Sequence, residues 1–272
     1  MTKLSKNCHA MYSITTDYST DTGNPFPCIE KISNAGFSYV HWCHEWSTDY
    51  LYSNDEIGEI KKYMTIFGLK VLDVHASYGL ETSWGALDEN LRQAGVDLVK
   101  NRIDMAVQLN SDVIIMHAPE YTDPIRKSLD ELQPYTKSRN IKIAIENIIN
   151  FPIVDKYFSD YEPDFLGLCY DSGHGNIEKN SYEWLDKFKE RLLSIHIHDN
   201  DGKKDLHQIP FTGTVDWERL SKLLAKSSYK KCVSLEVSMH NMKINDENEF
   251  LAQSFNAAEK LSDMISSSNR LD

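Results

Sequence analysis

Short apolar runs, rich in β-branched and aromatic residues, recur at a steady interval along this chain of 272 residues. Runs of this length and composition are typical of buried strands. The segments between them carry polar residues and the wider spacing of helices. The pattern predicts strands at residues 8–14, 37–43, 70–75, 112–117, 142–146, 166–170, 193–198 and 232–237.

The intervening segments also carry start and stop signals for helices. Ser53 and Glu56 form a capping-box pattern, in which each residue satisfies a backbone N–H of the other, and Gly68 follows the end of that helix. Apolar residues recur at three- and four-residue intervals in the longest segment. Helices are predicted at residues 25–36, 53–67, 88–109, 125–138, 152–158, 181–191, 217–226 and 247–262.

Regular alternation of eight strands with helices predicts an α/β protein built as a single (β/α)8 TIM barrel. A doubly wound open sheet is the alternative, but no Gly-x-Gly-x-x-Gly motif follows the first strand. No linker rich in Pro, Gly or Ser divides the chain, so one domain is expected over residues 1–272. Residues 266–272 are expected to be a frayed tail.

Polar residues with metal-binding side chains stand at the ends of six of these strands. In a barrel the carboxyl ends of all strands meet at one mouth, where active sites lie. Each residue has an ordinary alternative, such as an acid that starts a helix or pairs with a lysine. Carboxylates are nevertheless rare inside apolar runs without a partner. The six residues are His75, His117, Glu146, Asp171, His196 and Glu236, and the turn after Asp171 adds His174.

The segment 193–217 has the densest set of these side chains. His196 and His198 are two residues apart on the seventh strand, so both imidazoles leave the same face. The loop that follows contains two further candidate ligands, Asp205 and His207. Any one of these residues alone would be interpreted as a solvated loop residue or as a core histidine whose nitrogens are hydrogen-bonded. Together they form a donor set that suits a divalent metal such as zinc or manganese.

Composition narrows the class of partner. The formal net charge is −12, which argues against a protein that grips a phosphate backbone, so nucleic acid is not the expected partner. Five scattered cysteines without a CxxC motif fit reduced thiols, and hence a cytoplasmic location. The first residues lack the apolar core of a signal peptide, and no run is long enough to span a membrane.

Six motifs in this chain resemble those of the xylose-isomerase-like TIM barrels, which comprise sugar and sugar-phosphate isomerases and epimerases together with endonuclease IV. The similarity extends from about residue 11 to residue 237. The motifs are HASYG (75–79), MHAPE (116–120), IAIEN (143–147), YDSGH (170–174), HIHDNDGKKDLH (196–207) and SLEV (234–237).

The resemblance implies a metal site. In the isomerase branch the implied ligands fall on Glu146, Asp171, His196 and Glu236. The endonuclease IV branch has ligands for a cluster of three ions, and its further positions are occupied here by His75, His117, His174, Asp205 and His207. One to three divalent ions (Zn, Mn, Mg or Co) are therefore implied. The sequence departs from the family at residues 210–213, where Pro-Phe-Thr-Gly replaces a Pro-Gly-x-Gly turn, and it lacks the Gly-rich stretch that follows Glu146 in the nuclease branch.

The reaction that the resemblance implies is isomerisation or epimerisation of a sugar or sugar phosphate. Glu146 or Glu236 would remove a proton beside a metal-chelated carbonyl to give an enediolate, and the other would return it. His174 and His207 would bind hydroxyl groups. His41 and His44, at the end of the second strand, are candidates for substrate contact, although aromatic packing is the usual role of such a segment. Lys203 is a candidate phosphate ligand unless it is simply solvated.

Two other functions stay open. The first is hydrolysis of phosphodiesters by several metal ions, as in endonuclease IV, which the full set of nine ligand positions permits. The second, a binding protein on an inactive barrel, is disfavoured because both glutamates are present. The expected partner is a small carbohydrate. The sequence leaves open whether the protein forms homo-oligomers.

Overall fold

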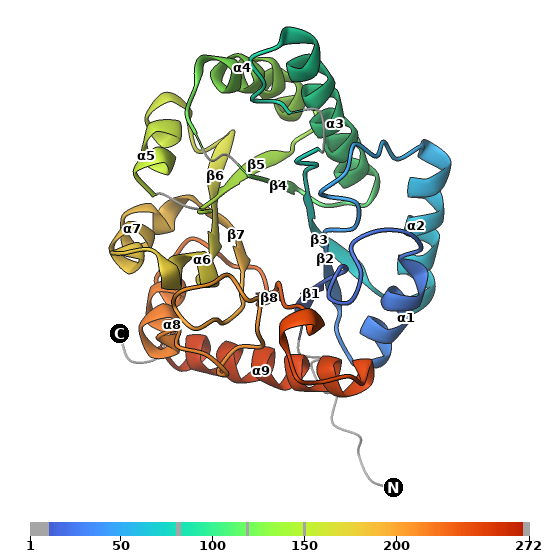
Figure 1. The fold of residues 1–272 in the computed structure, drawn as a ribbon, viewed down its shortest axis with the longest axis vertical. Coiled ribbons are helices and arrows are strands. Elements are labelled where there is room, and N and C mark those ends of the chain that lie inside the picture. The colour runs from blue at the N-terminus through green and yellow to red at the C-terminus, as the bar shows by residue number, and fades with distance from the viewer. Residues whose placement is uncertain (1–10, 80–82, 118–119, 149–150, 269–272) are drawn as a thin grey trace, which may run out of the picture.

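The computed structural model describes residues 11–79, 83–117, 120–148 and 151–268. Eight parallel strands lie at the centre of the molecule and helices surround them (Figure 1). The fold is the predicted single (β/α)8 barrel. The strands are β1 (Ser13–Thr15), β2 (Tyr39–Trp42), β3 (Lys70–His75), β4 (Val113–His117), β5 (Lys142–Glu146), β6 (Leu166–Asp171), β7 (Leu192–His196) and β8 (Ser234–Leu235).

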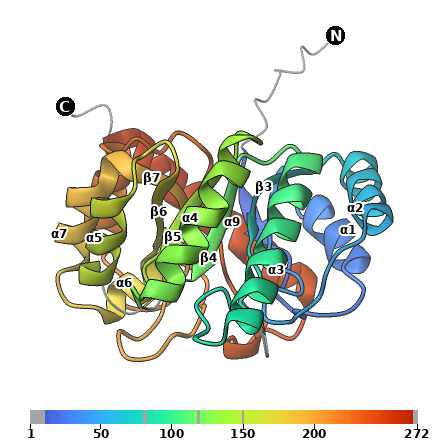
Figure 2. The ribbon, with the colours of Figure 1, turned by 90° about the horizontal axis from the view of Figure 1, so that it is seen from above.

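The helices form an outer layer, and Figure 2 shows α3 and α4 lying outside the strands. The last helix, α9, packs against both α8 and α1, so the ring of helices joins its end to its beginning. The helices are α1 (Phe26–Asn34), α2 (Asn54–Phe67), α3 (Glu89–Gln108), α4 (Asp123–Lys137), α5 (Phe151–Asp160), α6 (Ser172–Ile177), α7 (Ser181–Phe188), α8 (Trp217–Ala225) and α9 (Glu247–Ser268), with short 3₁₀ turns η1 (Lys189–Arg191) and η2 (Met239–Asn241).

Hydrogen bonding closes the ring of strands in the order β7-β6-β5-β4-β3-β2-β1-β8. The seam between β7 and β8 is an isolated parallel bridge between Ile197 and Leu235. The Ile197 amide donates to the carbonyl of Ser234 at 2.9 Å, and the Glu236 amide donates to the carbonyl of Ile197 at 3.1 Å. The barrel is therefore closed immediately beside His196 and Glu236.

Local signals in the sequence explain several boundaries. The Ser53 side chain accepts from the Glu56 amide, and the Glu56 carboxylate accepts from the Ser53 amide, so the predicted capping box is confirmed. Helix α2 ends at Gly68, which has φ of 68°, a conformation that favours glycine. The apolar runs of the strands are buried on both faces, as expected for parallel strands covered by helices.

Some boundaries differ from prediction. The first strand is Ser13–Thr15, later than the predicted 8–14, because only these residues pair with β2 and β8; residues 8–10 lie outside the described part. Residues 266–268, expected to fray, continue helix α9, while 269–272 are not described. Helix α6 was not predicted. None of the described helices combines the length and apolar character needed to cross a lipid bilayer.

Candidate metal centre

Four acidic and imidazole side chains meet at the mouth of the barrel. Glu146, Asp171 and His196 end three neighbouring strands, and Glu236 directly follows β8. One ligand atom from each lies within 4.8 Å of those of the others. The His196 Nδ1 atom lies 3.2 Å from Glu146 Oε2 and 3.0 Å from Glu236 Oε2, so the two glutamates flank one imidazole nitrogen. All four residues are buried.

Strand register explains this convergence. Glu146 pairs with His117 across β4 and β5, and Asp171 pairs with His196 across β6 and β7. Residues paired in register point to the same side of the sheet. The segments are far apart in the sequence, but parallel pairing brings their last residues to one level.

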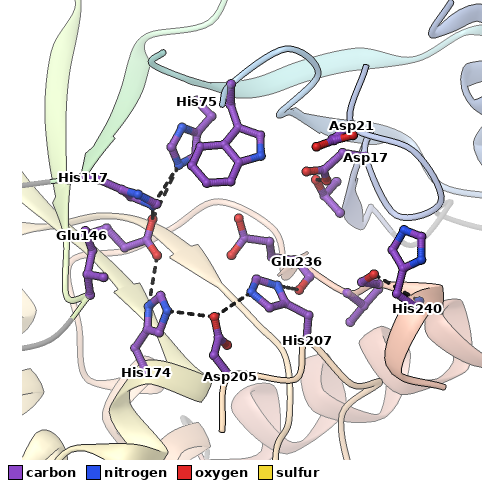
Figure 3. A pocket seen from close by; sticks show the side chains of 15 residues that line it. Asp17, Asp21, His75, His117, Glu146, His174, Asp205, His207, Glu236 and His240 are labelled. Carbon is purple, nitrogen blue, oxygen red and sulfur yellow. Dashed lines mark hydrogen bonds and ion pairs between the residues drawn. The ribbon is translucent and has the colours of Figure 1, made fainter. Parts of the chain in front are cut away.

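A second group lies beside Glu146. His75 Nε2 is 3.2 Å from His117 Nε2, and His117 Nε2 is 3.3 Å from Glu146 Oε2. The ring of Trp46 packs on both imidazoles, with centroid distances of 5.0 and 5.2 Å. Figure 3 shows His75 and His117 on one wall of the pocket. His75, His117 and Glu146 thus form a compact set of nitrogen and oxygen donors.

A third group lies on the opposite side of Glu146. His174 Nδ1 is 3.2 Å from Glu146 Oε1, and its Nε2 is 3.2 Å from Asp205 Oδ2. The same carboxylate oxygen of Asp205 lies 3.0 Å from His207 Nε2 (Figure 3). Asp205 therefore joins the two histidines that were predicted to bind substrate hydroxyls.

Asp171 is held by a network that the sequence did not indicate. The His198 Nε2 atom lies 3.0 Å from Asp171 Oδ2, and the His174 amide donates to Asp171 Oδ1 at 2.6 Å. The His198 ring stacks on that of His207, with centroids 4.2 Å apart and planes 5° from parallel. His198 is fully buried and fills the space beside Gly173. His196 and His198, which share a face of the chain, thus contact different carboxylates.

These three groups of side chains border a cavity of about 430 Å³. Asp17 and Asp21, which follow β1, lie across it from Glu146 together with His240 (Figure 3). Of the described residues that line the cavity, none is a lysine or arginine. The lining is Thr15, Asp17, Asp21, Trp46, His75, His117, Glu146, Ile148, His174, Asp205, His207, Glu236, Val237, Ser238 and His240.

Charges in this region shift several pKa values. Burial opposes ionisation of Glu146, but the charges of His196 and His117 outweigh it and hold the pKa of Glu146 well below its usual value. Burial likewise disfavours protonation of His196, yet Cys169 and the two glutamates raise its pKa well above 6.5. The pKa of Asp171 falls to about 2, because His174 and His198 outweigh burial. Glu146 and Asp171 are thus ionised at neutral pH.

The donor set fits a divalent metal ion. The described residues contain buried atoms without a hydrogen-bond partner, and four of them meet here: Glu146 Oε2, His174 Nδ1, and both ring nitrogens of His196. Unpaired buried polar atoms are costly in a finished fold, whereas a cation would satisfy several at once. Carboxylate and imidazole are the ligands that zinc and manganese accept.

Stability of the metal-free protein should depend on His207. Burial disfavours the imidazolium, but the hydrogen bond to Asp205 and the charge of Glu236 raise the pKa of His207 to about 10. A raised pKa stabilises the fold below the unfolded value of 6.5 and loses this contribution as pH rises to about 10. We expect chelator-treated protein to have a lower melting temperature at pH 9.5 than at pH 7, by thermal unfolding. The His207→Gln variant should show a smaller difference; an equal difference in both would contradict the prediction.

The structure brings together all nine residues predicted as metal ligands, and it leaves two predicted substrate contacts elsewhere. His44 lies outside the cavity lining, and its Nε2 is 2.9 Å from the carbonyl of Gly23. Lys203 is exposed and also outside the lining. Asp17 and Asp21 were missed because the first strand was placed too early, which hid the polar residues that follow its true end.

Known proteins resemble this chain in sequence and fold. A model of the family described as xylose isomerase-like TIM barrel matches residues 29–261. The "Uncharacterized protein y4fM" of Sinorhizobium fredii is 29% identical over 88% of this chain and 89% of its own. A fructoselysine 3-epimerase of Shigella flexneri is 22% identical over 55% of this chain and 61% of its own.

Two solved structures share the fold. A D-tagatose 3-epimerase-like protein has a TM-score of 0.75 at 18% identity, over 95% of this chain and 98% of the other. A D-psicose 3-epimerase, determined in the presence of D-fructose, has a TM-score of 0.77 at 15% identity, over 93% and 99%. At these identities the likeness is one of fold.

Proposed function

This chain belongs to the xylose isomerase-like TIM barrel family, and on that premise we propose that it is a metal-dependent isomerase or epimerase of sugars. The observation that carries the proposal is the position of Glu146 and Glu236 on either side of His196 Nδ1. Two carboxylates that flank one centre suit reversible proton transfer. Relatives named as sugar epimerases support the same class.

The metal would be held by the four-residue cluster of Glu146, Asp171, His196 and Glu236. A divalent ion held there would polarise a substrate carbonyl and so acidify the neighbouring C–H bond. Zinc, manganese, magnesium and cobalt all accept ligands from this set. The neighbouring groups around His75 and Asp205 offer donors for further ions.

Glu146 is one candidate for the base that removes the proton, because its carboxylate is ionised and borders the cavity. Glu236 faces it from beyond β8 and would return a proton at the adjacent carbon or on the opposite face. The proton thus passes between the substrate carbon and these two side chains.

His174 and His207 would orient the substrate. Burial disfavours their charged forms, but nearby carboxylates raise the pKa values of both rings in the metal-free state. Both rings line the cavity, where a sugar hydroxyl would take the place of Asp205 as a hydrogen-bond partner. The absence of lysine and arginine from the described cavity lining favours an unphosphorylated substrate over a sugar phosphate.

A multi-metal phosphodiesterase is the second candidate. It is favoured by the two further donor groups, His75 with His117 and His174 with Asp205 and His207, which border the same cavity. The same lining and the net charge of −12 weigh against an anionic polymer as substrate.

Hydrogen exchange tests the proposal. Metal-loaded protein is incubated in deuterated water with D-fructose, D-tagatose, D-psicose and further ketoses. We expect mass spectrometry to show deuterium at the carbon beside the carbonyl, and chelation to abolish it. Elemental analysis accompanies the assay, because one ion per chain fits the isomerase and three ions fit the hydrolase. A loaded protein that exchanges none of the sugars but cleaves a phosphodiester would reverse the order of the candidates.

A further inference from the structure

His41 lies in the barrel interior beneath the four-residue cluster and has no role in the proposed reaction. It belongs to β2 and is fully buried. Its Nδ1 atom is 2.7 Å from Oδ1 of Asp73 on β3, which is also fully buried. The other oxygen of Asp73 accepts a hydrogen bond from the Ser194 hydroxyl of β7. Three strands therefore contribute to fixing one imidazole.

This arrangement determines which ring nitrogen carries hydrogen. Oδ1 of Asp73 lies 2.7 Å from His41 Nδ1, and its other oxygen accepts from Ser194, so Asp73 acts as the acceptor in both contacts. His41 Nδ1 is therefore the donor. In the neutral ring Nε2 then keeps its lone pair, and this atom is buried without a hydrogen-bond partner.

The surroundings of Nε2 contain other metal-binding atoms. It lies 3.8 Å from Glu236 Oε1, and the rings of His41 and His196 have centroids 4.4 Å apart. One ligand atom from each of His41, His196 and Glu236 lies within 4.8 Å of the other two. His75 is the next ring, with its centroid 5.9 Å from that of His41.

The 3.8 Å separation distinguishes two roles for His41. It exceeds the 2.7–3.2 Å of an ordinary N–H···O hydrogen bond, so the ring does not hold Glu236 directly. With metal–ligand bonds near 2.1 Å, two ligands of one ion stand about 3.0–4.2 Å apart, which includes the observed value. A histidine that ligates a metal also commonly donates its other N–H to a carboxylate, as His41 does to Asp73.

We propose that His41 is a metal ligand, which binds a divalent cation together with His196 and Glu236 while Asp73 fixes the orientation of its ring. This proposal rests on the proposed function, in which the protein depends on a metal ion, and it names a further ligand of that ion. It adds a residue from β2 to a centre whose other ligands come from β5 onwards. A buried lone pair that would otherwise be left unsatisfied is used by the ion.

Metal affinity and the spectrum of bound Co²⁺ test the proposal. The His41→Asn variant can keep a side-chain N–H near the position of Nδ1, for Asp73, and it removes Nε2. We expect at least a 100-fold rise in the Co²⁺ dissociation constant, measured by competition with a chromophoric chelator, and a changed visible spectrum. The Asp73→Asn variant should raise the constant about 10- to 100-fold.

His44→Asn is the matched control. His44 is also a buried histidine near the end of β2, but it lies outside the cluster, so the Co²⁺ dissociation constant and spectrum should stay at wild-type values. Circular dichroism checks the fold of each variant. If His41→Asn does not fold, the isosteric Asp73→Asn variant carries the test through the same readouts.

The outcomes distinguish failure of the His41 proposal from failure of the proposed metal-dependent function. Wild-type affinity and spectrum in folded His41→Asn, or in Asp73→Asn when only that variant folds, would overturn the proposal. Reduced turnover with unchanged affinity would also overturn it and assign His41 to hydrogen bonding with Glu236. A wild-type protein that binds no divalent ion would remove the proposed function itself, together with the role of His41.

Discussion

The Glu146→Gln variant is expected to lose about 10²- to 10⁴-fold in the rate of hydrogen exchange from the epimer whose proton Glu146 removes. Glutamine preserves the shape of the side chain and one oxygen, but it cannot accept the proton. The loss should fall on kcat rather than on KM, because the reacting group acts in the transition state. Exchange into deuterated water, followed by mass spectrometry, measures the effect directly.

Metal content must be measured in the same samples, since Glu146 is also a proposed ligand. The rate should stay low even when the ion is fully loaded. The Glu183→Gln variant is a matched control, because Glu183 lies on the exposed face of α7 and forms an ion pair with Arg219 of α8. Its exchange rate should equal that of the wild type. Wild-type kcat in loaded Glu146→Gln would remove this side chain from the reaction.

Glu236→Gln distinguishes a two-acid mechanism from a one-acid mechanism. If Glu146 removes the proton and Glu236 returns it from the other side, this variant should still exchange the hydrogen of one epimer. Its net interconversion of epimers should fall by about 10²- to 10⁴-fold. Equal loss of exchange for both epimers would assign Glu236 to metal binding alone.

The second large effect is expected from Gly173→Ala. A Cβ atom at this position would lie far inside contact distance of the His198 ring, which is buried and bonded to Asp171. The ring has no free direction in which to move, so we expect at least about 2 kcal/mol lower stability by urea unfolding. Gly58→Ala is the control: nothing lies within 4 Å of its Cβ position, and an alanine there should stabilise the exposed helix α2 by about 0.5–1 kcal/mol.

A double-mutant cycle identifies the cause. In the background of His198→Ala, the Gly173→Ala change should cost at least about 1 kcal/mol less than it does alone, since the ring that it strikes is absent. Equal costs in the two backgrounds would show that the strain lies in the backbone of α6 instead.

Much of this architecture could be read from the sequence because strands in a barrel are short, apolar and regularly spaced. The polar residues that end such runs, Glu146 and Asp171 among them, could be placed at one rim by the topology alone. Their distances could not, since these depend on how adjacent strands are staggered. A register shift between Leu168 and Cys169 is one such detail that no local pattern reveals.

The roles of His41 and His198 could not be assigned from the sequence for a different reason. Both histidines were recognised as candidates, but their contacts are with partners far along the chain, Asp73 and Asp171. His41 depends on Asp73 and Ser194, which look like ordinary interior positions of two other strands. Pairs of this kind become visible only when the side chains inside the barrel are placed together.

The seam between Ile197 and Leu235 has a consequence for when the protein can act. Glu236 directly follows this short junction, and His196 directly precedes it. If Glu236 acts as proposed, a local opening between β7 and β8 would separate it from Glu146 and Asp171, which lie on the other side of the seam. We therefore expect metal binding and proton transfer to depend on closure of this one joint.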